Sequence, residues 1–201
     1  MNYFPMFFNL KDKVVLICGG GKHAIEKIER LMPFSPIIRV ISESISPEIK
    51  EIEGLSIHER PFSQKDLECA PAFVVAAEEY CECKRISDIC KKYNIPVNAV
   101  DIPTLCDFIF PSIIATEQLC IAISTGGASP TAAIKLKQQI SELIPSSIDE
   151  ILSWMLPARE LVKKALPKDK QKKALQLIVQ KAFSEDRVLE DEELTNIIRS
   201  V

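Results

Sequence analysis

The sequence predicts an α/β protein with a doubly wound parallel sheet, followed by a short strand and loop segment and a small all-helical C-terminal domain. Three observations support this fold class. Short apolar runs alternate with helical patterns up to about residue 100, which is typical of a parallel sheet covered on both faces. A turn of three glycines directly follows the first run. Residues 146–201 carry helical periodicity and no strand-like run.

The first strand is predicted at residues 13–18, KVVLIC, a short apolar run with β-branched residues between charges and glycines. A helix is predicted over 22–32, where apolar residues recur at helical spacing until Pro33 ends it. The next strand is predicted at 37–41, and a helix begins near Ser46, a good N-cap followed by proline. Further strands are predicted at 55–58, 73–76 and 96–100. They alternate with a short helix that begins at 63 and a longer helix at 83–93.

Beyond residue 101 the pattern changes. Two strand-like runs at 107–114 and 118–124, separated by the polar segment ATE, favour a hairpin or a sheet edge. A helix is predicted from Ser129 and Pro130 to residue 143. Three helical periods follow at 148–166, 168–183 and 190–198, separated by Pro157, Pro167 and the acidic segment 184–186. These patterns predict three domains, at 1–112, 113–145 and 146–201.

Composition excludes several classes of protein. The 201 residues carry a formal charge of −3, which argues against nucleic acid or an anionic membrane as the main partner. No apolar stretch is long enough to span a bilayer. The N-terminus lacks the basic leader and cleavage site of a signal peptide. Seven cysteines, an odd number at irregular spacing, fit reduced thiols, so we expect a cytoplasmic protein.

The strongest local signal is the turn Gly19-Gly20-Gly21-Lys22-His23-Ala24, which matches G-x-G-x-x-A between a predicted strand and a predicted helix. Gly19 permits the tight turn, Gly21 lets the backbone approach a pyrophosphate, and the helix N-terminus favours an anion. The pattern therefore predicts a Rossmann-like dinucleotide site. The alternative is that three glycines merely turn the chain.

Glu43 and Ser44 follow the second strand, where a dinucleotide site places the side chain that meets the adenosine ribose. A carboxylate there accepts a hydrogen bond from a ribose hydroxyl and repels an extra phosphate, which predicts NAD rather than NADP. Arg39 and Lys22 nearby weaken this prediction. The alternative is that Glu43 is a solvated loop residue.

Two further clusters have chemical potential. Ser124, Thr125, Gly126 and Gly127 precede a predicted helix start and offer hydroxyls and N–H groups to an anion; a plain turn with an N-cap is the alternative. Cys81, Cys83 and Cys90 lack a second C-x-x-C or histidine pair. We therefore predict ordinary thiols and no metal site.

Three separated blocks, residues 3–31, VNAVDIPTLCDFIFPSII at 97–114 and IAISTGGASP at 121–130, resemble the precorrin-2 dehydrogenases of sirohaem synthesis. The likeness covers about residues 3–145. It implies NAD-dependent oxidation of precorrin-2, an acidic tetrapyrrole, to sirohydrochlorin by a homodimer. In this family the region 113–145 serves dimerisation and the substrate, and the helical tail contributes to the dimer and the substrate cleft.

The resemblance also assigns residues. It implies cofactor binding by residues 19–23, by Glu43 and Ser44, and by Ala77, which lies in the segment that the family places near the cofactor. It implies substrate binding by the segment Ser124 to Gly127. We expect Asn98 to support the substrate site by shaping the adjacent loop through side-chain hydrogen bonds.

The resemblance ties catalysis to Asp101, at the end of a predicted strand. A carboxylate there can accept the proton that is lost when the macrocycle is oxidised. From spacing alone, a second interpretation stays equally open, in which Asp101 only caps the turn before Pro103.

One segment departs from the family. A stretch that usually reads like Ala-Thr-Asp-Asp, with an asparagine beyond it, here runs from Ala76 to Cys83 as AAEEYCEC. Extra carboxylates near a dinucleotide phosphate are unfavourable unless they point to solvent. One alternative is therefore a tetrapyrrole-binding protein that has lost oxidation. A second alternative, which follows from the resemblance itself, is a bifunctional dehydrogenase and ferrochelatase that acts through Asp101.

Overall fold

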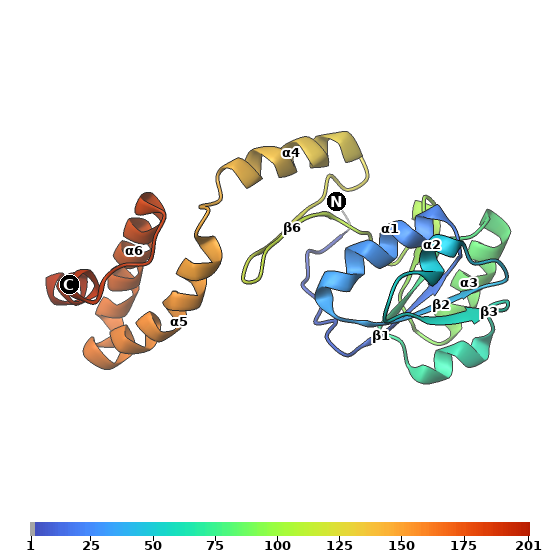
Figure 1. Cartoon of the computed structure of the whole chain (residues 1–201), viewed down its shortest axis with the longest axis horizontal. Helices are drawn as coiled ribbons and strands as arrows, with labels where there is room; N and C mark the ends of the chain where they lie inside the picture. Colours follow the sequence, from blue (N-terminus) through green and yellow to red (C-terminus); the bar gives the residue numbers. More distant parts are fainter. Residues whose placement is uncertain (1–2) are drawn as a thin grey trace. The chain divides into compact units, whose positions relative to one another are not determined.

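The computed structural model describes residues 3–201, and its internal contacts divide the chain into two compact units that meet in sequence at Phe110 and Pro111. Met1 and Asn2, where the predicted 1–112 domain begins, lie outside the described residues. Figure 1 shows the helices and strands of both units, coloured along the sequence. The finer division at residues 145 and 146 stays a prediction.

The first unit is built on a five-stranded, all-parallel sheet in the order β3-β2-β1-β4-β5. Its strands are β1 (Val14–Cys18), β2 (Ile37–Ser42), β3 (Ser56–Glu59), β4 (Phe73–Ala76) and β5 (Val97–Ala99). The chain adds β2 and β3 on one side of β1 and then returns to add β4 and β5 on the other. This order confirms the predicted doubly wound fold.

Helices cover both faces of this sheet. They are α1 (Lys22–Leu31), α2 (Pro47–Lys50) and α3 (Tyr80–Lys92), with short 3-10 helices at Met32–Phe34, Gln64–Cys69 and Pro103–Leu105. Side chains of β1 alternate between the faces: Val15 packs in one cluster with Ile28 of α1, and Leu16 packs in the other with Ile86 of α3. Both clusters are fully apolar at their centres, so the central strands are buried on both sides.

Several element boundaries differ from the predictions, and the strand predicted at 107–114 begins only at Ser112 and ends at Ala115. The helix near Ser46 is a single turn, the segment after Ser63 is a 3-10 helix, and α3 begins at Tyr80 rather than at Cys83. In α3 the N–H of Cys83 already donates to the carbonyl of Glu79 at 2.9 Å. That first turn is polar and largely exposed, so apolar periodicity could not reveal it.

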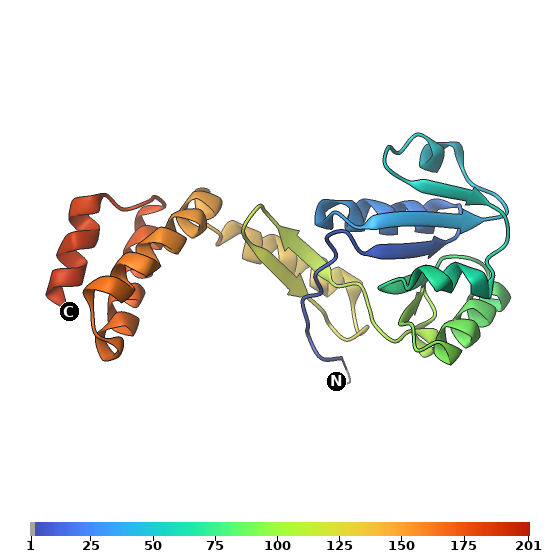
Figure 2. The same cartoon turned by 90° about the horizontal axis from the view of Figure 1, so that it is seen from below.

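The second unit contains an antiparallel hairpin and four helices: β6 (Ser112–Ala115), β7 (Cys120–Ile123), α4 (Pro130–Glu142), α5 (Ile148–Ala165), α6 (Lys168–Glu185) and α7 (Asp191–Ser200). Figure 2 shows α4 beside the two strands. The predicted role of Pro157 as a separator is wrong, because α5 runs through it. Ile151 and Val162, on either side of the proline, pack in one core with α6 and α7, which offsets the hydrogen bond that proline removes.

Asp186 ties the start of α5 to the end of α6. The residue has a left-handed φ of 47°, and its carboxylate accepts hydrogen bonds from the N–H and hydroxyl groups of Ser146 and Ser147 at 2.6 to 3.0 Å. The hydroxyl and N–H donors of Ser147, followed by the hydroxyl of Ser146, hold the pKa of Asp186 well below its usual range. The ionised carboxylate is therefore the form that the fold stabilises.

Replacing Asp186 with Ala should lower the melting temperature at neutral pH and make it less sensitive to acid. A carboxyl whose pKa is lower in the folded state adds stability above its unfolded pKa of about 4, and that stability is lost as the pH falls towards the folded value. Circular dichroism melts at pH 7 and pH 3 measure this effect. The difference in melting temperature between the wild type and the variant should narrow from pH 7 to pH 3, and a difference that stays constant with pH would contradict this role.

Candidate dinucleotide and catalytic site

The glycine turn lies at the point where the order of the sheet reverses. β1 ends between β2 and β4, and the chain passes from Cys18 through the glycines into α1. In open α/β sheets, ligands bind at the carboxyl ends of the strands beside this switch point. The predicted cofactor residues Gly19 to His23 therefore occupy the place where a ligand is expected.

The first two glycines are required by close backbone contacts. Gly19 has a φ of 147°, and a Cβ there would lie 2.5 Å from the carbonyl oxygen of Ala77. A Cβ at Gly20 would lie only 1.8 Å from the carbonyl oxygen of Ser44. Hydrogen bonds fix the turn on both sides. The N–H of Ser46 donates to the carbonyl of Gly20 at 2.9 Å, and the N–H of Ala77 donates to the carbonyl of Cys18 at 2.7 Å. Any larger residue at Gly20 would push the two loops apart.

Gly21 is different, because nothing lies within 4 Å of the position that its Cβ would occupy. It is the N-cap of α1, it offers no side chain to the first N–H groups of the helix, and the first turn carries no acidic residue. The N–H of Ala24 donates to the carbonyl of Gly21 at 3.0 Å, whereas those of Lys22 and His23 have no partner within the helix. Gly21, Lys22 and His23 are all exposed, so the turn presents free donors and open space of the kind that a pyrophosphate needs.

A hollow of about 900 Å³ opens beside the turn. Glu43 and Ser44 line it, as do Gly20 and Gly21, whereas Ala77 only supports Gly19 through its backbone. The charged groups along its wall are four carboxylates and one guanidinium, from Glu43, Glu78, Glu79, Glu82 and Arg85. The wall is therefore acidic next to the end of β2.

Three contacts in this wall were missed by sequence reasoning. The hydroxyl of Ser42 donates to Glu78 at 2.6 Å, which joins the ends of β2 and β4. Arg85 donates to Glu82 at 2.7 Å and to the carbonyl of Phe62 at 2.7 Å, and its hydrogen bonds lower the pKa of Glu82. The only sequence signal was the position of Ser42 and Glu78, each at or just after a strand end.

Asp101 follows β5 at the same edge of the sheet. It is exposed and has a left-handed φ of 59°, a conformation that aspartate tolerates better than most residues. Backbone hydrogen bonds hold the turn on either side of it. The N–H of Val100 donates to the carbonyl of Ala76 at 2.8 Å, and the N–H of Ile102 donates to the carbonyl of Ala99 at 3.2 Å. Its carboxylate is thus presented to solvent from a fixed backbone.

Asn98 supports this loop from below. Its side chain is buried, and its amide donates to the carbonyl of Phe108 at 2.8 Å. The bond ties β5 to the segment that follows the Asp101 turn. It is the kind of loop-shaping contact that we expected, and it leaves Asn98 inside the protein rather than facing a ligand.

Lys27 is a further residue that sequence reasoning missed. It lies on α1, half-buried, with its amine 5.1 Å from the centre of the Phe110 ring. Burial lowers the pKa of this amine, followed by the neighbouring Arg30, while the carboxylate of Asp101 acts in the opposite direction. The glycine-turn helix therefore carries a cation into the surroundings of Asp101.

The predicted anion loop lies in the second unit, between β7 and α4. Its hydroxyls are used within the loop: Thr125 donates to the carbonyl of Ser129 at 3.1 Å, and Ser124 accepts from the N–H of Gly126 at 3.0 Å. Ser129 caps α4 through the N–H of Ala132. Gly126 and Gly127 both have positive φ. The loop is a formed and exposed turn, and its binding role stays a prediction.

The cysteines behave as separate thiols. All seven are free, with Cys83 and Cys90 buried and Cys81 exposed. Burial raises the pKa of the Cys90 thiol to about 12 and also raises that of Cys83, which disfavours the thiolate that binds metals. Across residues 3–201, no three metal-binding side chains come together.

The sheet order and the open glycine turn define a dinucleotide-binding protein with a doubly wound sheet. The chain belongs to a family described as putative NAD(P)-binding, whose model matches residues 6–112. The cofactor prediction is thereby confirmed at the level of NAD(P) binding. No helix within residues 3–201 is both long and apolar enough to cross a membrane.

Individual relatives show a similar sequence over most of this chain. The chain is 33% identical over 176 residues to a siroheme synthase of Methylococcus capsulatus and 32% identical over 170 residues to one of Thioalkalivibrio sulfidiphilus. These matches cover 86% and 83% of this chain but only 37% and 35% of those proteins. The chain thus spans little more than a third of the length of these relatives.

The fold also matches a solved structure over its whole length. SirC, a precorrin-2 dehydrogenase, superimposes with a TM-score of 0.70 at 22% identity, over 99% of this chain and 100% of that one. Together with the siroheme synthases, this match confirms the resemblance predicted from the three sequence blocks. It also confirms the predicted fold class, including the helical C-terminal part.

Proposed function

We propose that the chain catalyses the NAD-dependent oxidation of precorrin-2 to sirohydrochlorin. The observation that carries the proposal is the open position at Gly21, at the switch point of a sheet whose same edge presents the Asp101 carboxylate. The similarity to siroheme synthases and the fold of a precorrin-2 dehydrogenase support the choice of substrate.

The chemistry divides between the cofactor and Asp101. Oxidation of the macrocycle removes one hydride and one proton. NAD, when bound, supplies the hydride acceptor. The Asp101 carboxylate takes the proton as general base, and the N–H groups at the start of α1 hold the pyrophosphate. Asn98 keeps the catalytic turn in place through its bond to Phe108.

The direct test incubates the purified chain with precorrin-2 and NAD and follows the absorbance of sirohydrochlorin. Appearance of product that requires both the protein and NAD supports the proposal. Tetrapyrrole binding without turnover would favour the second candidate, a binding protein that has lost oxidation, which is suggested by the acidic Ala77 to Cys83 segment. The bifunctional alternative is not favoured, since the full-length structural match is to a dehydrogenase.

NAD should bind at least about tenfold more tightly than NADP. The carboxylates of Glu43 and Glu78 lie at the end of β2, where the ribose phosphate of NADP would meet like charges. The only cation in that wall, Arg85, is held by Glu82. Fluorescence titration with both dinucleotides measures the two affinities.

Glu43→Gln should narrow this preference by raising the affinity for NADP. The control is Glu53→Gln, which removes the same charge from an exposed position that does not line the hollow. Tighter binding of NADP to the unmodified protein would overturn the assignment of NAD.

Three further predictions stay part of this proposal. We propose a homodimer, because Ile134 and Leu136 of α4 and Leu143, which follows the helix, are exposed by 54%, 44% and 82%. Exposed apolar side chains that gather along one stretch of the chain favour an interface. We propose that residues 113–145 form its dimerisation segment. The odd number of free cysteines supports a cytoplasmic location.

A further inference from the structure

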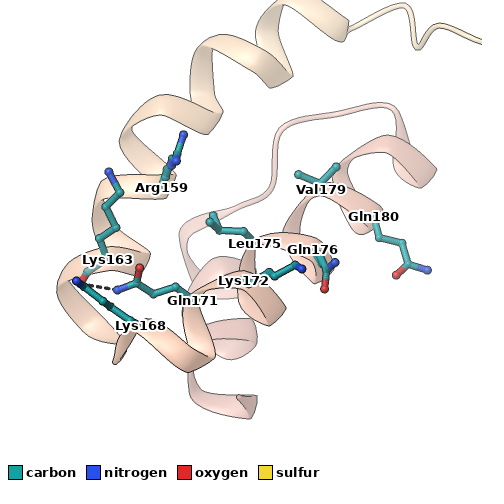
Figure 3. A pocket seen from close by; sticks show the side chains of 9 residues that line it. All are labelled: Arg159, Lys163, Lys168, Gln171, Lys172, Leu175, Gln176, Val179 and Gln180. Carbon is teal, nitrogen blue, oxygen red and sulfur yellow. Dashed lines mark hydrogen bonds between the residues drawn. The ribbon is translucent and has the colours of Figure 1, made fainter.

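The helical part of the second unit contains a groove that is lined by none of the residues to which the proposed reaction assigns a role. It has a volume of about 610 Å³ and lies between the C-terminal half of α5 and residues 168–180 of α6. Figure 3 shows side chains of both helices around it. This volume falls in the range of small-molecule sites in proteins.

The groove is strongly basic. Four cationic side chains line it and no carboxylate does: Arg159, Lys163, Lys168 and Lys172. Only Lys163 forms an ion pair, with Glu160 at 2.6 Å; among residues 3–201 no carboxylate pairs with the other three. Because the whole chain has a formal charge of −3, the positive charge of the groove is a local concentration and not a property of the whole surface.

The position of the lysines is unfavourable for the helix itself. Lys168 is the first residue of α6, and the helix opens with the sequence KDKQKK. Cations at a helix N-terminus are destabilised by the helix dipole. Lys163 differs, because it lies in the last turn of α5, where the helix dipole favours a cation. An anion in the groove would compensate the excess charge of Lys168 and Lys172.

The floor of the groove is apolar. Leu175 and Val179 of α6 line it and are half-buried, and the amides of Gln176 and Gln180 stand beside them. Gln171 is fixed, since its amide donates to the carbonyl of Leu166 at 2.9 Å. Simple phosphate would leave the apolar floor uncovered. The absence of aromatic residues from the lining also disfavours single-stranded nucleic acid, which stacks its bases on aromatic rings.

We propose that this groove binds a polycarboxylate with a compact apolar body. The apolar body covers Leu175 and Val179, and its carboxylates meet the amine and guanidinium groups around the rim. The porphyrinoid substrate and product belong to this chemical class, so the groove would hold one of them outside the catalytic site; this last identification rests on the proposed function.

The test uses uroporphyrin, a porphyrin with eight carboxylates, and the full chain without dinucleotide. Fluorescence titration compares the unmodified protein with the double variant Lys168→Gln/Lys172→Gln. The matched control is Lys170→Gln/Lys173→Gln, which removes the same charge from the same helix at positions outside the groove. The groove variant should bind the porphyrin about tenfold more weakly, since it loses two charge-assisted contacts, and the control should change less than twofold.

Two outcomes overturn the proposal. Equal weakening by both double variants would mean diffuse attraction to a basic helix rather than a site. Unchanged binding in the groove variant would place the porphyrin elsewhere on the protein. Leu175→Gln gives an independent arm, because loss of the apolar floor should weaken uroporphyrin but leave tripolyphosphate binding unchanged.

Failure of this site can be separated from failure of the proposed reaction. The titration requires neither NAD nor turnover, and it can be repeated in an Asp101→Asn background. If the protein oxidises precorrin-2 but its uroporphyrin binding does not depend on Lys168 and Lys172, the proposed reaction stands and the groove is rejected as a binding site. If uroporphyrin binding depends on these lysines but precorrin-2 is not oxidised, the groove stands as a polycarboxylate site and the proposed reaction is rejected.

Discussion

Asp101→Asn is expected to lower the rate of precorrin-2 oxidation by roughly 10²- to 10⁴-fold, the usual contribution of a positioned general base. Asparagine matches aspartate in size and also tolerates the left-handed backbone at this position. The variant should therefore keep its fold and its affinity for NAD while losing the proton acceptor. Single-turnover absorbance measurements, together with NAD titration, separate the two effects.

Asp12→Asn provides the matched control for this experiment. Asp12 is also exposed and also left-handed, with a φ of 60° against 59° at Asp101, but it lies just before β1, at the opposite end of the strands. Its replacement should leave turnover unchanged. Full activity in Asp101→Asn would reduce Asp101 to a turn residue, which is the alternative left open by its spacing before Pro103.

Gly20→Ala and Gly21→Ala should fail in different ways. At Gly20 the added methyl group would meet the Ser44 carbonyl oxygen at 1.8 Å, so the turn must move; overpacking of this kind costs about 1 to 3 kcal/mol or more. At Gly21 the methyl group meets no protein atom, and the φ of −107° suits alanine. The second variant should fold, with a loss of about 1 kcal/mol from the poorer N-cap.

Dinucleotide binding should be lost in both variants, but for separate reasons. In Gly20→Ala the turn is displaced, whereas in Gly21→Ala the methyl group fills the space kept for the pyrophosphate. Thermal melts and NAD titrations of the two proteins measure stability and binding independently. Normal NAD affinity in Gly21→Ala would show that the pyrophosphate does not lie at this turn.

The fold was predictable because its main determinants are local. Alternating apolar runs and the Gly19 to Gly21 turn determine a parallel sheet with its switch point. The acidic wall was not predictable in detail, because the Ser42 to Glu78 bond joins residues 36 positions apart. Pro157 was misread for a related reason: core packing on both sides of it outweighs its local preference.

The candidate site shows the same limit. Asp101 and the glycines stand at strand ends that periodicity reveals. Lys27 was hidden because its spacing on α1 resembles that of any solvated lysine, and only the packed chain brings it to Phe110. Contacts between elements far apart in sequence leave no local pattern.

The bracing of the glycine turn has a thermodynamic consequence. Because its neighbours Ser46 and Ala77 already hold it in place, the entropy of ordering this loop is lost when the polypeptide folds and not when a ligand arrives. A ligand that fits such a preorganised cradle adds its whole binding free energy to the native state. Saturation with nucleotide should therefore protect the amides around the cradle from hydrogen exchange without changing the backbone path.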